Sequence, residues 1–306
     1  MPLFRTHRHA RAFRALFALL ALVLATAAQT TRACDIRQGD VAVGTGTMPY
    51  ITAGKADNAP VVLLVHGLFA QKEQWNDLLC ALTDAGYHPI APDLPGYGQS
   101  HGYDLSVYPL SAQVRLLGEF SRKVGAIPTH IAGNSMGGAI AALYADAHPE
   151  SIRSLAFIGG TLGIGSWADT VKASILAGNN PFIPTTSAAL DAELHMLLTH
   201  PPELSAELRA AILAPYQQDT THYIQVWNIV NLYGDALAHP PNRQLPTLIL
   251  WGQEDRVFDV HHSAKLGKRY VHHQLHRLPG TGHLAMIDAP ALVNERYLAF
   301  LKQQTR

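Results

Sequence analysis

Short apolar runs alternate with amphipathic stretches along most of the chain. The run Val61–Val65 is apolar without interruption, as a strand buried on both faces of a sheet should be. Strands that alternate with helices predict a mainly parallel sheet covered by helices on both faces. Further strands are expected at residues 41–43, 50–52, 89–91, 129–132, 154–158, 247–251 and 274–278, with helices at 74–85, 111–123 and 136–144.

This alternation stops near Gly160 and resumes at Thr247. Between them, over residues 161–243, the pattern is mostly helical and rich in Leu, Ile, Trp and Pro. A helical insertion between two strands of one sheet is expected to cap the carboxyl edge of the sheet, where open α/β sheets bind ligands. We therefore predict an α/β core formed by residues 28–160 and 244–306, and a helical cap formed by 161–243. A second independent domain is the alternative, and it is disfavoured because the sheet pattern continues afterwards.

The first 27 residues have the composition of a targeting segment. Four arginines (residues 5, 8, 11 and 14) precede an apolar stretch over residues 15–25, and Ala25-Thr26-Ala27 supplies small residues at A-x-A spacing. This order is typical of a secretory signal peptide. The apolar stretch is short for a membrane span, which needs about 20 residues, so an uncleaved anchor is the alternative. We expect an exported protein, periplasmic or secreted.

Charge and composition limit the kinds of molecule that this protein is expected to bind. The chain has 23 basic and 23 acidic residues, and removal of residues 1–27 would leave 19 basic and 23 acidic residues. Such a balance gives no basic surplus for nucleic-acid binding. We expect a small-molecule partner and contact with a lipid interface; the sequence does not determine the oligomeric state.

The two cysteines, Cys34 and Cys80, both lie beyond the leader. An oxidising compartment would permit a disulfide between them, but sequence does not give the Cα separation that a disulfide requires. Cys80 falls off the apolar stripe of its predicted helix, so we expect its side chain to be accessible.

A candidate nucleophile lies in the pattern G-x-S-x-G, where Ser135 is flanked by Gly133 and Gly137. A predicted strand precedes the pattern and an Ala-rich helix follows it. A sharp strand-to-helix turn forces the serine into a strained conformation and requires small neighbours. The turn also places the hydroxyl at a helix N-terminus, which favours developing negative charge. These flanks distinguish a nucleophile from a chance Gly-Ser turn.

A serine hydroxyl needs an adjacent base, and chain order selects the base among the histidines. His283 follows the last predicted strand, and Asp255 follows the strand before it, which gives the order Ser, Asp, His. Asp255 would hold one tautomer of His283 and stabilise the imidazolium. Glu254 and Asp259 are interpreted as solvated loop carboxylates.

The oxyanion of an acyl-transfer reaction needs two fixed N–H donors. The amide of Met136, directly after the nucleophile, is one candidate. The other is the amide of Leu68, in the loop after the strand Val61–Val65. His66 in that loop is interpreted as a structural hydrogen-bonding group. No metal-ligand spacing or dinucleotide fingerprint occurs in the sequence, so no cofactor is expected.

Several segments together resemble the α/β-hydrolase superfamily over residues 45–303. The resemblance rests on His66-Gly67, the loop 93–100, the motif 133–137, the segment 251–255 and Gly282-His283. As a set they are specific for the fold and much less so for the substrate.

A narrower resemblance is to membrane-associated monoacylglycerol lipases and related bacterial lipases. It rests on residues 133–138, 180–184, 251–252 and 257–260. It implies a lipase-like carboxylic-ester hydrolase with an apolar, capped pocket. In the predicted cap, Phe182, Trp227 and Leu232 are the residues to test first, and the sequence does not show which of them faces the pocket. A carbon–carbon bond hydrolase on the same triad, or a non-catalytic ligand-binding protein of this fold, is the alternative.

Overall fold

The centre of the molecule is an eight-stranded sheet with strand order β1-β2-β4-β3-β5-β6-β7-β8. The computed structural model describes residues 34–54, 58–238 and 244–304. The first two pairs in the sheet are antiparallel and all the others are parallel, which confirms the prediction of a mainly parallel sheet. The strands are β1 (Arg37–Val43), β2 (Gly46–Thr52), β3 (Val61–Val65), β4 (His88–Pro92), β5 (His130–Ser135), β6 (Ser154–Thr161), β7 (Thr247–Gly252) and β8 (His273–Leu278).

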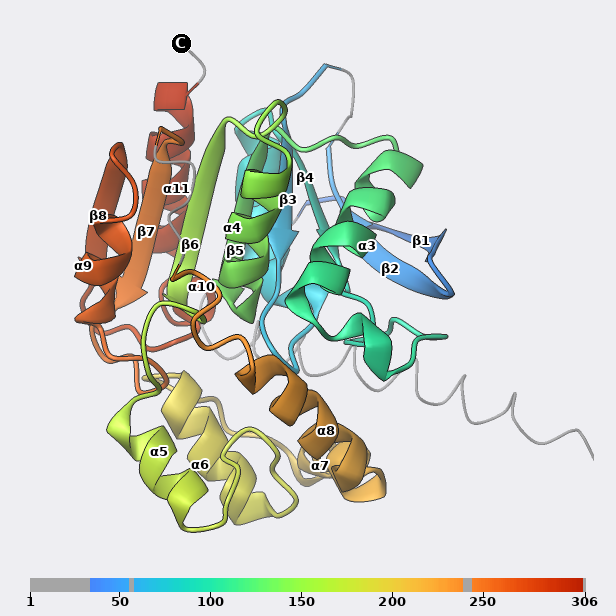
Figure 1. The fold of residues 1–306 in the computed structure, drawn as a ribbon, viewed down its shortest axis with the longest axis vertical. Helices are drawn as coiled ribbons and strands as arrows, with labels where there is room; N and C mark the ends of the chain where they lie inside the picture. Colours follow the sequence, from blue (N-terminus) through green and yellow to red (C-terminus); the bar gives the residue numbers. More distant parts are fainter. Residues whose placement is uncertain (1–33, 55–57, 239–243, 305–306) are drawn as a thin grey trace, which may run out of the picture.

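Helices cover both faces of this sheet, as Figure 1 shows. Helices α3 (Leu110–Lys123) and α4 (Met136–Ala147) pack together on one face, whereas α2 (Asn76–Asp84) and α11 (Pro290–Gln304) pack together on the other. Successive residues of a strand point to opposite faces. In β3, Leu63 accordingly joins the core on the α4 side and Leu64 joins the core on the α2 side. The uninterrupted apolar run in the sequence therefore reflects burial on both faces.

Shorter helices complete this core. They are the 3-10 helices η1 (Lys72–Trp75) and η2 (Leu105–Val107), and the α-helices α9 (His262–Gly267) and α10 (Ala285–Asp288). The helix expected at residues 74–85 thus begins as a 3-10 turn and continues as α2.

Among the described residues, four helices lie between β6 and β7 and are called the cap below. Figure 1 shows them beyond the carboxyl ends of the parallel strands. They are α5 (Asp169–Leu176), α6 (Ser187–Leu197), α7 (Ala206–Gln218) and α8 (Thr220–Asn231). Thr186, Ser205 and Asp219 accept hydrogen bonds from the first-turn amides of α6, α7 and α8, at 3.2, 3.2 and 3.0 Å, and such caps fix where each helix begins.

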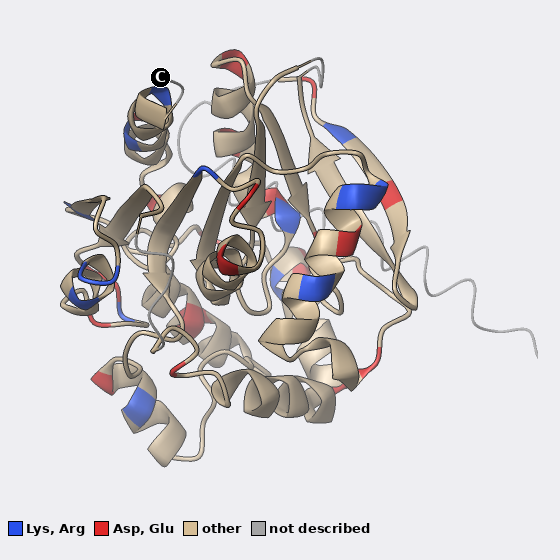
Figure 2. Cartoon of the chain, turned by 45° about the horizontal axis from the view of Figure 1, so that its top comes forward, with Lys and Arg blue, Asp and Glu red and all other residues tan. Residues whose placement is uncertain are grey.

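The proposed leader, residues 1–27, lies outside the described residues. Among those that are described, no helix is both long enough and apolar enough to cross a bilayer. Charged residues are scattered over the core without a continuous basic face in the view of Figure 2, and α8 carries neither Lys, Arg, Asp nor Glu.

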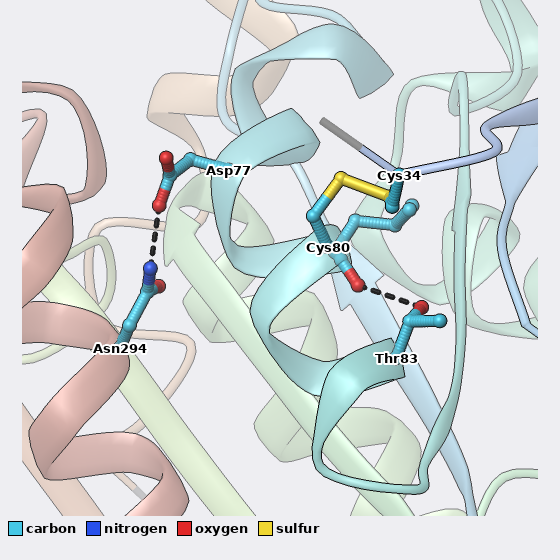
Figure 3. The surroundings of a disulfide bond; sticks show 6 residues. Cys34, Asp77, Cys80, Thr83 and Asn294 are labelled. Carbon is cyan, nitrogen blue, oxygen red and sulfur yellow. Dashed lines mark hydrogen bonds between the residues drawn. A yellow bond between two sulfur atoms is a disulfide. The ribbon is translucent and has the colours of Figure 1, made fainter. Parts of the chain in front are cut away.

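A disulfide joins Cys34 to Cys80 and holds the segment before β1 against α2 (Figure 3). The two Cα atoms are 5.4 Å apart, within the range that a disulfide spans. Cys80 is only 1% exposed, so the expectation of an accessible side chain is wrong. The helical pattern placed Cys80 off the apolar stripe, but the segment that carries Cys34 covers this side of the helix.

A buried ion pair fixes the loops that follow β3 and β4. The Lys72 ammonium group lies 2.8 Å from a carboxylate oxygen of Asp93 and 2.8 Å from one of Glu73. Burial alone would lower the pKa of Lys72, but the charges of Asp93 and Glu73 raise it overall. Asp93 also accepts hydrogen bonds from the amides of Lys72 and Gln99. The two loops at the carboxyl edge of the sheet are therefore joined by charge as well as by packing.

We expect replacement of Lys72 by Met to lower the free energy of unfolding by about 3–5 kcal/mol, because the Asp93 side chain, 0% exposed, would keep an uncompensated buried charge. Urea denaturation would measure the change. The matched control is Lys123→Met, which removes a surface pair with Glu119 and should cost less than about 1 kcal/mol. Equal, small losses in both variants would contradict the role given to the buried pair.

Candidate active site

Ser135 lies at the junction of β5 and α4. Its backbone has φ 56° and ψ −124°, in the left-handed half of backbone space that side chains other than glycine rarely adopt. Strain of this kind persists only where the surrounding structure enforces it, and it occurs often at functional sites. The turn exposes the hydroxyl above the carboxyl edge of the sheet, as the G-x-S-x-G pattern predicts.

Two glycines permit this turn because other backbone passes directly over them. A Cβ atom on Gly133 would lie 2.2 Å from the carbonyl oxygen of Gly137, and one on Gly137 would lie 2.3 Å from the carbonyl oxygen of His66. Both distances are far below van der Waals contact, and the atoms met are backbone atoms. Any side chain at either position would therefore force α4 away from the sheet.

His283 and Asp255 form a buried pair. The His283 Nδ1 atom lies 3.0 Å from Oδ2 of Asp255, and their side chains are 3% and 0% exposed. The second carboxylate oxygen, Oδ1, accepts hydrogen bonds from the amides of Val257 and Phe258, at 2.9 and 3.1 Å. The carboxylate is thus held on both sides. Donation from Nδ1 leaves Nε2 as the basic nitrogen of the imidazole.

Asn134 connects the nucleophile turn to the loop of His283. Its side-chain amide donates to the carbonyl oxygen of Ile158 at 2.8 Å and to that of His283 at 3.2 Å. The two carbonyl groups come from segments far apart in the chain, and the amide holds them beside Ser135. This role is not predictable from the sequence, since Asn134 occupies the variable position of the motif and no local pattern indicates its partners.

The loop after β3 packs directly against Ser135. A Cβ atom on Gly67 would lie 3.2 Å from Cβ of Ser135, and Leu68 and Met136 both line the same cavity as Ser135. His66 stabilises the loop: its Nδ1 donates to the carbonyl oxygen of Gly67 at 2.8 Å, and its Nε2 accepts from the amide of Leu94 at 2.9 Å. Burial lowers the pKa of His66, and a neutral imidazole suits these two bonds. The structural role expected for His66 matches these contacts.

Both other loop carboxylates near Asp255 are exposed, as expected. Glu254 nevertheless has a contact that the sequence did not suggest, because it accepts a hydrogen bond from the amide of Thr281 at 2.8 Å. It therefore holds the loop that leads to His283. Asp259 accepts from the amide of His261 at 2.8 Å. No cluster of three or more potential metal ligands occurs in the part of the chain that the structure describes.

A cavity of about 490 Å³ extends from Ser135 and His283 under the cap. Its cap side is mainly apolar and includes Leu162, Trp167, Phe182, Leu190, Leu194, Ile212, Val226 and Val230.

The three cap residues named as the first to test differ in their positions relative to the cavity. Phe182 does line the cavity. Trp227 lies behind the lining and stacks on Phe182 and Trp167, with ring centroids 5.0 and 5.1 Å apart. Leu232 is 76% exposed and does not line the cavity. It follows α8 directly, where the helical period no longer decides which way a side chain points.

Known proteins are similar to this chain in sequence and architecture. The chain is 27% identical to a monoacylglycerol lipase, abhd6-B, of Xenopus laevis over 79% of this chain and 75% of that protein. It is 26% identical to Lipase 1 of Psychrobacter immobilis over 83% and 80% of the two chains. The crystal structure of a membrane phospholipase A, described as a bacterial virulence factor, superposes with a TM-score of 0.83, 28% identity and coverage of 96% and 93%.

The family described as the alpha/beta hydrolase fold matches residues 60–290. That range includes the nucleophile turn, the buried His283–Asp255 pair and all four cap helices. The chain therefore belongs to the α/β-hydrolase fold family.

Proposed function

We propose that this protein is a carboxylic-ester hydrolase of the lipase type, acting on monoacylglycerols or other esters with apolar acyl chains. One observation carries the proposal: Ser135 on its strained turn and the buried His283–Asp255 pair open onto a single apolar cavity. The names of the relatives, monoacylglycerol lipase and lipase, support this substrate class.

In the proposed reaction, Nε2 of His283 removes the proton of the Ser135 hydroxyl as its oxygen attacks the ester carbonyl carbon. The imidazolium that forms is stabilised by Asp255, which lies out of contact with solvent. The tetrahedral oxyanion accepts hydrogen bonds from the amides of Leu68 and Met136. Each such donor typically contributes a factor of about 10²–10³ to the rate.

Collapse of the tetrahedral intermediate breaks the bond to the alcohol oxygen, which takes its proton from His283. The acyl group then remains on Ser135. A water molecule, deprotonated by His283, attacks the acyl-enzyme, and the second collapse releases the acid and restores the serine. Every proton transfer uses the same imidazole, so no cofactor enters the proposed reaction.

Replacement of Ser135 or His283 by Ala should lower kcat for p-nitrophenyl esters by about 10⁴ or more. Asp255→Asn should also lower it strongly, because the imidazole would lose its fixed tautomer. Steady-state rates and labelling by a serine-reactive phosphonate would measure these effects. Asp259→Asn, an exposed change four residues from Asp255, is the control and should leave kcat unaffected. Near wild-type turnover by folded Ser135→Ala protein would show that Ser135 is not the nucleophile.

If the cap cavity holds the acyl chain, kcat/KM should rise with chain length by up to about fourfold for each buried methylene, which is worth about 0.8 kcal/mol, and fall once the cavity is full. Phe182→Ala should move the optimum to longer chains, because Phe182 lines the cavity. Leu232→Ala is the matched control, since Leu232 is 76% exposed. A preference for acetyl esters in the wild type and in both variants would instead indicate a short-chain esterase or the carbon–carbon bond hydrolase.

We also propose that the protein is exported and that the segment 1–27 is its signal peptide. The disulfide between Cys34 and Cys80 supports this proposal, because disulfides persist mainly in oxidising compartments. N-terminal sequencing of the protein from its native host should show a mature end near Ala28. An intact Met1 in the membrane fraction would instead identify the segment as an anchor.

A further inference from the structure

Glu193 places a carboxyl group in the wall of the cap cavity. It lies on α6 between Leu190 and Leu194, which form an apolar cluster with Leu213 of α7. The carboxyl group forms no hydrogen bond or ion pair with any described residue. Burial raises the pKa of Glu193 to about 8, so the group is mostly an uncharged carboxylic acid at neutral pH.

No Lys or Arg among the described residues forms an ion pair with this carboxyl group. Arg209 of α7 pairs instead with Asp191, two residues before Glu193 on α6, at 2.6 Å and at the surface of the cap. The described residues that line the cavity include neither Lys nor Arg. The cavity therefore contains a carboxyl group without the charge partner that buried acids usually have.

Tyr216 lies beside Glu193 and also lines the cavity. Burial and the nearby Glu193 together raise the pKa of Tyr216 well above its usual value, so its phenol keeps its proton. The ring of Tyr216 packs against Phe69, with centroids 6.1 Å apart. Phe69 directly follows Leu68, so the ring of Tyr216 packs against the loop that faces Ser135.

An acyl-binding wall has no need of a carboxyl group at this position. Glu193 is half-buried and lines the cavity, and a carboxyl group that faces an apolar cavity without a protein partner is costly to desolvate when a ligand fills that cavity. A leucine, as at positions 190 and 194, would bind an alkyl chain better. An uncharged carboxyl group donates one hydrogen bond and accepts others, and a hydroxyl group does the same, so the two are complementary.

We propose that Glu193, together with Tyr216, is a specificity-determining subsite that binds a hydroxyl group of an uncharged ester substrate. The proposal rests on the ester-hydrolase function proposed above. The hydroxyl group belongs either to the alcohol part of the ester, as in a monoacylglycerol, or to a hydroxylated acyl chain. Anionic esters are disfavoured, because the described residues that line the cavity include neither Lys nor Arg to pair with them.

Two substrate pairs test the subsite. The first compares 1-monodecanoylglycerol with propyl decanoate, which share the acyl chain and the three-carbon alcohol and differ in two hydroxyl groups. The second compares propyl 10-hydroxydecanoate with propyl decanoate. For each pair the ratio of kcat/KM values is measured in wild type, Glu193→Leu, Glu193→Gln and Tyr216→Phe. Glu207→Leu, at an exposed position of the cap, is the control.

Glu193→Leu should lower at least one ratio about fivefold, the loss of one uncharged hydrogen bond, while its kcat/KM for propyl decanoate stays equal or rises. Glu193→Gln should retain the ratio within about twofold, and Glu207→Leu should not change it. A fall in the first ratio identifies a hydroxyl group of the alcohol part as the ligand, and a fall in the second identifies one of the acyl chain. Both ratios unchanged in folded Glu193→Leu protein would overturn the subsite. A wild-type protein that hydrolyses no ester at all would overturn the proposed function itself.

The pH profile provides a second readout that a purely structural role would not change. Above a pH of about 8, ionisation of Glu193 puts a charge into the apolar cavity, so kcat/KM for propyl decanoate should fall. Tyr216 does not titrate in this range, since its pKa is well above 10. Glu193→Gln protein should lack this fall. If kcat/KM for propyl decanoate falls equally above pH 8 in wild-type and Glu193→Gln protein, Glu193 is not a protonated carboxyl group in contact with the substrate.

Discussion

The close approach of α4 to the sheet at the nucleophile turn is the constraint on which the site depends. Backbone of α4 and of the loop after β3 occupies the space where side chains of Gly133 and Gly137 would lie. This contact fixes Ser135 in its left-handed conformation. It also places the first amide of α4 beside the loop that carries Leu68. The strain at one residue is thus maintained by packing along a whole helix and three strands, which explains how a costly conformation persists.

Buried charges then hold the loops around this turn. The Lys72–Asp93 pair lies in the loops after β3 and β4 and the His283–Asp255 pair in the loops after β7 and β8, on either side of the strand that carries Ser135. Each carboxylate also accepts backbone hydrogen bonds. Desolvation makes such pairs intolerant of losing one partner, so they specify loop positions more than they add stability. Asn134 connects the His283 loop to the turn through neutral hydrogen bonds. Preorganisation of this kind reduces the rearrangement needed as charge develops in the reaction.

The cap adds a cavity whose walls differ in chemistry. Trp167 and Phe182, backed by Trp227, form an aromatic wall, whereas Tyr216 and Glu193 present polar groups. An elongated ester with an apolar chain and a polar group matches such a division. The cap is joined to the core through Trp167, whose ring stacks on Phe258 with centroids 4.7 Å apart, and Phe258 also donates its amide to Asp255. Phe258 is therefore one of the contacts that connect the cap side of the molecule to the His283–Asp255 pair.

The sequence by itself determined the sheet, the nucleophile turn and the chain order of the candidate triad, because these depend on local patterns: apolar runs, glycines that admit close backbone, and loops that follow strands. The fold family followed from those motifs. Only the tertiary structure decided which side chains meet across long separations. The Cys34–Cys80 bond, the Lys72–Asp93 pair, the partners of Asn134, the burial of Cys80 and the exposure of Leu232 are of this kind. Each depends on the direction of a side chain relative to a segment distant in the chain, and neither hydrophobic period nor motif spacing contains that information.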